Sequence, residues 1–213
     1  MKVFWVFDVI SPYAYLGSLQ LSRLPAGTEL ELVPVLFAGL LKHYGQLGPA
    51  EILPKRRFTY RFVLWRARKL GVPLKVPPAH PFNPLGALRL IIAAGADMRA
   101  MRSGFDFVWG RGRDVSDAAV LADLARELGI ADVQAALNDP NVKQTLRRNT
   151  EWAAEHGVFG VPTFVIGKET FWGQDAFEMA LDYLRDPAQF DDEEMGRIDH
   201  LPVGVSRERP SRA

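Results

Sequence analysis

Residues 8–17 read Asp8-Val9-Ile10-Ser11-Pro12-Tyr13-Ala14-Tyr15-Leu16-Gly17 and join a strand to a helix. The preceding segment, residues 3–9, is aromatic and β-branched, as in a buried strand. Proline is favoured in the first turn of a helix, so a helix is predicted to begin near Pro12. Residues 29–37 alternate polar and apolar side chains and then turn apolar, which predicts a second strand. The chain therefore opens as β-α-β, with the two strands parallel.

The rest of the chain divides into a long helical part and a short return to strands. Residues 49–156 show helical patterns and no strand pattern, with three strong apolar faces in segments 58–65, 118–128 and 141–156. In the second of these, Ser116 is the predicted N-cap and Gly129 follows the end. Residues 163–166 and 170–172 read as a hairpin, and residues 175–184 as the last helix. The order is β-α-β, a helical insert, then β-β-α.

Composition narrows the classes of function. The chain has 213 residues, a net charge of +1 and no cysteine, so it has no disulfide and no thiol nucleophile of its own. Its four histidines lack ligand-like spacing, so no metal is expected. The balanced charge argues against a nucleic-acid partner, and no apolar run is long enough to span a membrane. The first residues read as a strand and not as a signal peptide, so a cytoplasmic location is expected.

Three segments carry possible chemistry, and each has a purely structural alternative. Ser11, at a strand-to-helix junction, either caps the helix or helps to bind an anion. Pro162 either starts a strand or follows a cis bond that would turn the Val161 N–H and C=O outward to pair with a bound peptide. Asp175 is either the N-cap of the last helix or, with the preceding residues, a contact for a charged peptide end.

In this order and topology, the three segments resemble the DsbA-like thioredoxin superfamily. Over residues 3–185 the chain is most similar to 2-hydroxychromene-2-carboxylate isomerases and kappa-class glutathione transferases. The motifs that carry the resemblance are Ser-Pro-Tyr-Ala-Tyr-Leu-Gly from Ser11, Phe-Gly-Val-Pro-Thr from Phe159 and Trp-Gly-Gln-Asp from Trp172. The resemblance implies an α/β fold with a thioredoxin-like domain, residues 1–48 and 157–188. A helical insert domain, residues 49–156, would cover its mouth, and residues 189–213 would form an extended or partly disordered tail.

The resemblance also implies where glutathione and a substrate bind. Ser11 would replace the first redox cysteine and hydrogen-bond the glutathione sulfur, and Val161 before Pro162 would pair with the cysteinyl backbone. Gly173, Gln174 and Asp175 would hold the γ-glutamyl end, and Trp172 and Pro162 would also belong to the glutathione site. Substrate contacts would fall on Lys42, Phe82 and Asn83. The isomerases' Asn-Arg pair is replaced here by Glu51-Ile52, which puts the chromene substrate itself in doubt.

The predicted activity is a glutathione-dependent isomerisation of a small aromatic or unsaturated organic acid. A kappa-like glutathione transferase or peroxidase is the alternative within enzymes, and a non-catalytic thioredoxin-like peptide-binding module the alternative outside them. A homodimer is implied by the resemblance.

Two further features of the insert have open interpretations. The segment 55–69 contains seven basic residues and no acid, and is either a solvated helix face or a contact for anionic groups of glutathione or substrate. The tryptophans at positions 65, 109 and 152 share helical faces with apolar residues. They are interpreted mainly as core, with Trp109 also a candidate for the wall of the substrate site.

Overall fold

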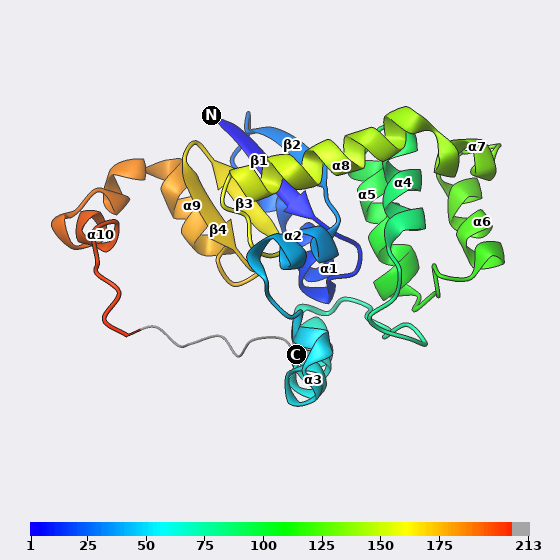
Figure 1. Ribbon diagram of the computed structural model, residues 1–213, viewed down its shortest axis with the longest axis horizontal. Helices are drawn as coiled ribbons and strands as arrows, with labels where there is room; N and C mark the ends of the chain where they lie inside the picture. The colour runs from blue at the N-terminus through cyan, green and yellow to red at the C-terminus, as the bar shows by residue number, and fades with distance from the viewer. Residues whose placement is uncertain (206–213) are drawn as a thin grey trace.

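The computed structural model describes residues 1–205 and contains one four-stranded sheet surrounded by helices (Figure 1). The strands are β1 (Lys2–Phe7), β2 (Glu29–Pro34), β3 (Thr163–Ile166) and β4 (Glu169–Trp172), in the spatial order β2-β1-β3-β4. β1 pairs with β2 in parallel, and β3 pairs antiparallel with both β1 and β4. The predicted β-α-β and β-β-α halves are thus confirmed and share one sheet.

The register places the first βα turn beside the start of β3. Val6, near the end of β1, pairs with Thr163, the first residue of β3. The turn after β1 leads into α1 (Pro12–Ser18), which begins at the predicted proline. Residues 8–11 and residues 160–162 are therefore neighbours, although about 150 positions separate them in the chain.

Helices form the rest of the molecule. Residues 49–156, all within the described part, contain no strand, as predicted. Two helices outside the insert follow strands of the sheet: α2 (Phe37–Tyr44) comes after β2, and α9 (Phe177–Arg185) comes after β4. The helices of the insert are α3 (Leu53–Leu70), α4 (Leu85–Ala93), α5 (Met98–Phe105), a π-helical turn (Asp106–Gly110), α6 (Ala118–Glu127), α7 (Val133–Asn138) and α8 (Pro140–Glu155). No helix among residues 1–205 is long and apolar enough to cross a bilayer.

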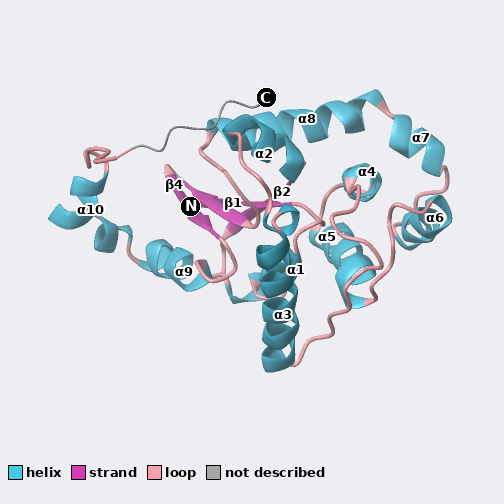
Figure 2. Cartoon of the chain, turned by 60° about the horizontal axis from the view of Figure 1, so that its bottom comes forward, coloured by secondary structure: helices cyan, strands magenta, loops and turns pink. Residues whose placement is uncertain are grey.

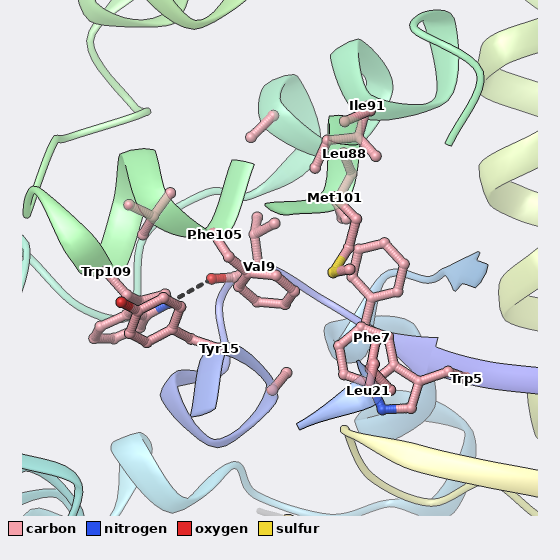
Figure 3. Close-up of a cluster of buried hydrophobic side chains, with 14 of the residues drawn as sticks. Trp5, Phe7, Val9, Tyr15, Leu21, Leu88, Ile91, Met101, Phe105 and Trp109 are labelled. Carbon is pink, nitrogen blue, oxygen red and sulfur yellow. Dashed lines mark hydrogen bonds between the residues drawn. The ribbon is translucent and has the colours of Figure 1, made fainter. Parts of the chain in front are cut away.

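Alternating side chains of β1 divide between two cores. Val3, Trp5 and Phe7 face a large core that also contains α1, α9 and the insert helices α4 and α5. Phe4 and Val6 face the other side, where α2 and the end of α8 cover the sheet. Figure 3 shows the junction of insert and sheet in the larger core, where Phe7 lies near Phe105 and Met101. The sheet and the insert therefore share continuous apolar packing, and their division into two domains stays a prediction.

Several local predictions were wrong. Asp117, not Ser116, caps α6, because its carboxylate accepts from the amides of Ala119 and Val120; the glycine after the helix is in place at Gly129. Asp175 does not cap α9, whose flanking residue is Ala176.

Two expectations for larger features also need correction. Trp65 is 48% exposed and is not core, whereas Trp109 is fully buried. The region after residue 188 is not wholly extended, because it contains a 3₁₀ turn (Pro187–Phe190) and α10 (Glu193–Ile198). Asp192 caps α10 through the Met195 amide, an acceptor that favours helix initiation. The rest of the predicted tail, residues 206–213, lies outside the described residues.

Candidate functional site

Ser11 is both a helix cap and a contact to the segment just before β3. Its hydroxyl oxygen accepts from the Ala14 amide at 3.2 Å, which satisfies one of the free N–H groups at the start of α1. The same hydroxyl donates to the carbonyl oxygen of Val161 at 3.2 Å, and the residue is 8% exposed. The capping interpretation is therefore correct, but the second bond also ties Ser11 to the segment that the sequence predicts as its functional partner.

The Val161-Pro162 bond is cis, as predicted, and lies beside Ser11. One detail differs from the expectation that both polar groups of Val161 would be free. Its carbonyl oxygen accepts the Ser11 hydroxyl, whereas its N–H has no partner in the part of the chain that the structure describes. A strand-like partner would thus find the amide available and would compete with Ser11 for the carbonyl.

The Trp172–Asp175 segment joins this cluster through the backbone. The Gly173 amide donates to the Pro162 carbonyl at 2.8 Å, and Gly173 has φ +97°, a left-handed conformation that favours glycine. Trp172 is exposed and packs its ring 5.0 Å from that of Phe159, centroid to centroid. The structure therefore brings Ser11, Val161, Pro162 and Gly173 together, as predicted.

Gln174 contains an unpartnered polar atom. The side chain is 6% exposed, and its Nε2 donor is buried with no acceptor among the described residues. Leaving such a group unsatisfied costs about 1–3 kcal/mol. Asp175, next in the chain, is exposed. Because this atom is closed off from solvent, a carboxylate or carbonyl of a ligand at this junction would accept from it only once the side chain turns outward.

Tyr13 connects the segment to α3. Burial raises the pKa of the Tyr13 phenol; the nearby Thr59 side chain of α3 opposes this and the charge of Asp175 adds to it. The Tyr13 ring also lies 6.2 Å from that of Phe62 on α3. Tyr13 therefore carries a protonated hydroxyl, a hydrogen-bond donor, between α3 and the Asp175 junction. Its position within the Ser-Pro-Tyr motif was the only sequence signal for this role.

Two nitrogen donors from the insert hold the turn before Ser11. Trp109, in the π-helical turn, donates its Nε1–H to the Val9 carbonyl at 2.7 Å (Figure 3). His80 Nε2 lies 2.8 Å from the Ile10 carbonyl. Two consecutive carbonyls of the turn are thus fixed by groups far away in the chain. This π-turn is the kind of helix irregularity found at functional sites.

His80 was not among the predicted site residues, and its two hydrogen-bond partners determine its tautomer. Because a carbonyl only accepts, Nε2 must carry the proton, and Nδ1 accepts from the Tyr60 hydroxyl at 2.5 Å. Burial lowers the pKa of His80, which keeps the ring neutral near pH 7. The only sequence signal was its position in the loop His80-Pro81-Phe82-Asn83-Pro84, which contains the predicted substrate contacts Phe82 and Asn83.

The three predicted substrate contacts lie in different surroundings. Phe82 is buried against the His80 ring, 5.6 Å between centroids, and so adjoins the turn that carries Ser11. Asn83 accepts from the Leu85 amide at 3.1 Å, which makes it a local support for the start of α4. Lys42 is exposed on α2, and no hydrogen bond or ion pair of the described residues links it to Ser11. Substrate binding by these residues stays a prediction.

Asp8 supports the same turn from the other side. The carboxyl is fully buried; Oδ1 accepts from the Ile10 amide and Oδ2 from the Phe37 amide, each at 2.9 Å. Burial raises its pKa from 3.8 to about 7, and the two N–H donors only partly oppose this. Among residues 1–205 no group of three His, Asp or Glu side chains could hold a metal ion.

Asp8 should make the protein less stable as pH rises. The unfolded carboxyl ionises above pH 3.8, whereas the folded one keeps its proton up to about pH 7. The folded state binds more protons in that window, so this group's contribution is full below pH 4 and is lost between about pH 4 and 7. The free energy of unfolding should fall by at most about 1.4 kcal/mol per pH unit in this range. Urea unfolding of wild type and Asp8→Asn at several pH values measures this pH dependence.

The comparison isolates Asp8 because all other titrating groups are common to both proteins. The amide that replaces the carboxyl in Asp8→Asn keeps one acceptor and loses the other, so the variant should be less stable at pH 5. Its disadvantage should shrink as pH rises to 7. A stability difference that is constant over this range contradicts the assignment.

The sheet order and the position of the turn define a thioredoxin-fold protein. A family model described as the DSBA-like thioredoxin domain matches residues 2–185, so the chain belongs to this family. It is 28% identical to glutathione S-transferase kappa 2 of Caenorhabditis elegans over 203 residues, 85% of this chain and 90% of that protein. It is also 28% identical to the 2-hydroxychromene-2-carboxylate isomerase of Sphingobium xenophagum over 188 residues, 84% of this chain and 96% of that one.

Solved structures agree on the fold. A 2-hydroxychromene-2-carboxylate isomerase superposes with a TM-score of 0.76 at 23% identity, covering 90% of this chain and 98% of that one. The cytosolic disulfide reductase DsbM of Pseudomonas aeruginosa, solved with GSH, superposes with a TM-score of 0.59 at 15% identity, covering 93% and 100%. The relatives are isomerases and glutathione transferases, and their names support an enzyme.

Proposed function

We propose that the cluster around Ser11 binds glutathione and activates its thiol. The observation that carries this proposal is the Ser11–Val161 hydrogen bond, which joins a hydroxyl at a helix start to a strand edge in a chain without cysteine. Val161 offers a free N–H beside Pro162, and Gln174 offers a buried donor without a partner among the described residues. Relatives named as kappa-class transferases, and a DsbM structure solved with GSH, support glutathione as the ligand.

In this proposal Ser11 stabilises negative charge on sulfur. Its single proton now lies toward Val161, so the hydroxyl must rotate from that carbonyl toward the sulfur, while the Val161 carbonyl turns to the ligand backbone. The Tyr13 amide has no partner among the described residues and is a second donor at the start of α1. A hydroxyl and an amide of this kind lower a thiol pKa by about one to two units.

We propose an isomerase of the 2-hydroxychromene-2-carboxylate isomerase type. Bound glutathione supplies a thiolate that adds to an unsaturated carbon of an aromatic 2-oxo acid precursor and later leaves it, so the net reaction is an isomerisation. Ser11 holds the sulfur charge before addition and after departure. His80 and Trp109 keep the turn in place through the Ile10 and Val9 carbonyls. Phe82 is an apolar neighbour for an aromatic ring, with Lys42 and Asn83 as further substrate contacts.

A kappa-like glutathione transferase is the second candidate. The observation in its favour is that relatives named as kappa transferases match with the same 28% identity as the isomerase. A product that retains the glutathione sulfur indicates a transferase, and a sulfur-free isomer indicates an isomerase. Binding of extended peptides without any glutathione-dependent turnover would instead indicate a non-catalytic peptide-binding module.

The thiol of bound glutathione can be titrated without a contribution from protein thiols, because the chain has no cysteine. We expect the ultraviolet thiolate absorbance of bound glutathione to titrate with a midpoint of about 6.5–7.5, below the free-thiol value of about 8.5. S-methylglutathione, which cannot ionise at sulfur, is the control for absorbance changes in the protein. An unshifted midpoint at saturating protein would refute thiol activation, and absence of binding would refute the site.

A further inference from the structure

The basic residues of this chain are concentrated in one stretch. From Ile52 to Ala96 there is no aspartate or glutamate, and nine lysines and arginines lie in this interval. The remaining residues contain 17 basic and 25 acidic side chains, so the near-neutral total conceals two regions of opposite sign. Seven of the nine cations lie on α3: Lys55, Arg56, Arg57, Arg61, Arg66, Arg68 and Lys69.

The α3 helix exposes an aromatic ridge on its outer face. Only Val63 and Ala67 of its 18 residues are buried, and they define the inner face. Phe58, Phe62 and Trp65, spaced four and three residues apart, share the opposite side. Phe58 is 65% exposed and Trp65 48%, and neighbouring rings lie 5.8 and 5.7 Å apart. In Figure 2 the helix projects from the body beyond α1. Tyr13 of α1 approaches Phe62, whereas Phe58 and Trp65 pair with no aromatic ring outside α3 among the described residues.

Cations flank the ridge on both sides. At 3.6 residues per turn, Arg57, Arg61 and Arg68 lie along one side of it and Lys55 and Arg66 along the other, while Lys69 continues the line of the ridge one turn beyond Trp65. None of the seven forms an ion pair within residues 1–205, whereas Arg126, Arg147 and Arg185 on other helices are each paired. The face is therefore an apolar strip bordered by uncompensated positive charge.

We propose that this face of α3 docks on the surface of an anionic lipid bilayer. Aromatic side chains suit the boundary between headgroups and acyl chains, and Lys and Arg beside them suit lipid phosphates and carboxylates. The acidic remainder of the protein is repelled by the same surface, so the charge asymmetry sets one orientation. The near-neutral net charge does not oppose this partner, because it is the placement of the charges that decides.

Two other occupants fit the face less well. A second copy docked α3 to α3 would bring seven uncompensated cations against seven. Single-stranded nucleic acid stacks its bases on free ring faces. Here Phe58 and Phe62 are stacked on each other at 23°, which leaves mainly their edges for contact.

The docked face adjoins the candidate site. Phe62, at the centre of the ridge, lies 6.2 Å from the Tyr13 ring, and Tyr13 is two residues from Ser11. A bilayer at this face would place apolar aromatic compounds near the site entrance. The docking proposal itself does not depend on glutathione chemistry.

The test is co-sedimentation of the full chain with vesicles of phosphatidylcholine alone or with about one third phosphatidylserine. We expect binding only to the anionic vesicles, weakened by salt, with a blue shift of Trp65 emission that Trp65→Phe removes. Replacing Arg57, Arg61 and Arg68 with glutamine should lower the partition coefficient about 100-fold, at roughly fivefold per cation near the surface. Replacing the ion-paired Arg126, Arg147 and Arg185 with glutamine removes the same charge elsewhere and should change it little.

Four results would overturn the proposal. The first is no binding to anionic vesicles at low salt by a protein whose circular dichroism is native. The second is an equal loss in both triple variants, which would show a response to net charge alone. The third is a wild-type dimer that the α3 substitutions dissociate, since this would assign the face to a second copy. Tighter binding to a single-stranded oligonucleotide than to vesicles would likewise replace the bilayer with nucleic acid.

Discussion

Ser11→Ala is expected to lower turnover about 10²–10³-fold while glutathione binds nearly as tightly as before. Loss of one well-placed donor to a resident or developing anion has this effect on rate, about 2.7–4 kcal/mol. Binding changes little because Val161 and residues 172–175 provide most of the proposed contacts. Activity is reduced and not abolished, because the Tyr13 amide remains. Steady-state kinetics and the thiolate titration of the variant measure both effects, and the titration midpoint should move to higher pH.

The cap made by Ser11 gives a second, separable effect. The Ala14 amide loses its acceptor in Ser11→Ala, which should cost about 1 kcal/mol of stability. Ser11→Thr keeps a hydroxyl but adds a methyl group to a buried turn, and should fall between alanine and wild type in rate. If Ser11→Ala is less stable but retains its turnover and thiol midpoint, Ser11 is only a helix cap.

The parts of the structure that local chemistry dictates could be predicted from the sequence. The β1-turn-α1 unit follows from an aromatic and β-branched run ending at Ser11-Pro12, and both halves of the sheet follow from similar runs. The cis bond before Pro162 and its closeness to Ser11 came from a resemblance over three motifs, because a proline before a strand alone is a weak signal.

Contacts between residues far apart in the chain could not be predicted from the sequence. The His80 imidazole and the Ile10 carbonyl are 70 residues apart, and a His-Pro dipeptide does not indicate which acceptor the imidazole will bind. Trp65 and Trp109 sit in similar apolar patterns, yet one is half exposed and the other fully buried. Helical periodicity shows which residues share a face, but packing decides which face is covered. Asp117 and Ser116 are both good caps, and only the observed backbone distinguishes them.

Trp109→Ala is expected to cause the largest loss of stability, about 3–5 kcal/mol, because it removes a fully buried indole from the core shared by sheet and insert. The variant also leaves the Val9 carbonyl without its donor. Denaturant unfolding measures the loss. A loss below about 1 kcal/mol would show that the insert packs on the sheet without this anchor.

Trp109→Phe separates packing from the hydrogen bond. Most of the ring volume stays, but the Nε1–H that holds the Val9 carbonyl at 2.7 Å is lost, and leaving a buried acceptor unpaired costs about 1–3 kcal/mol. Phe105→Leu is the matched control, since it thins the same core and removes no hydrogen bond of the turn. If Trp109 positions Ser11, Trp109→Phe should lower turnover more than Phe105→Leu at equal loss of stability. Equal turnover in the two variants would leave Trp109 a core residue only. The comparison thus tests whether the insert, by fixing the Val9 carbonyl, sets the geometry of the serine at the start of α1.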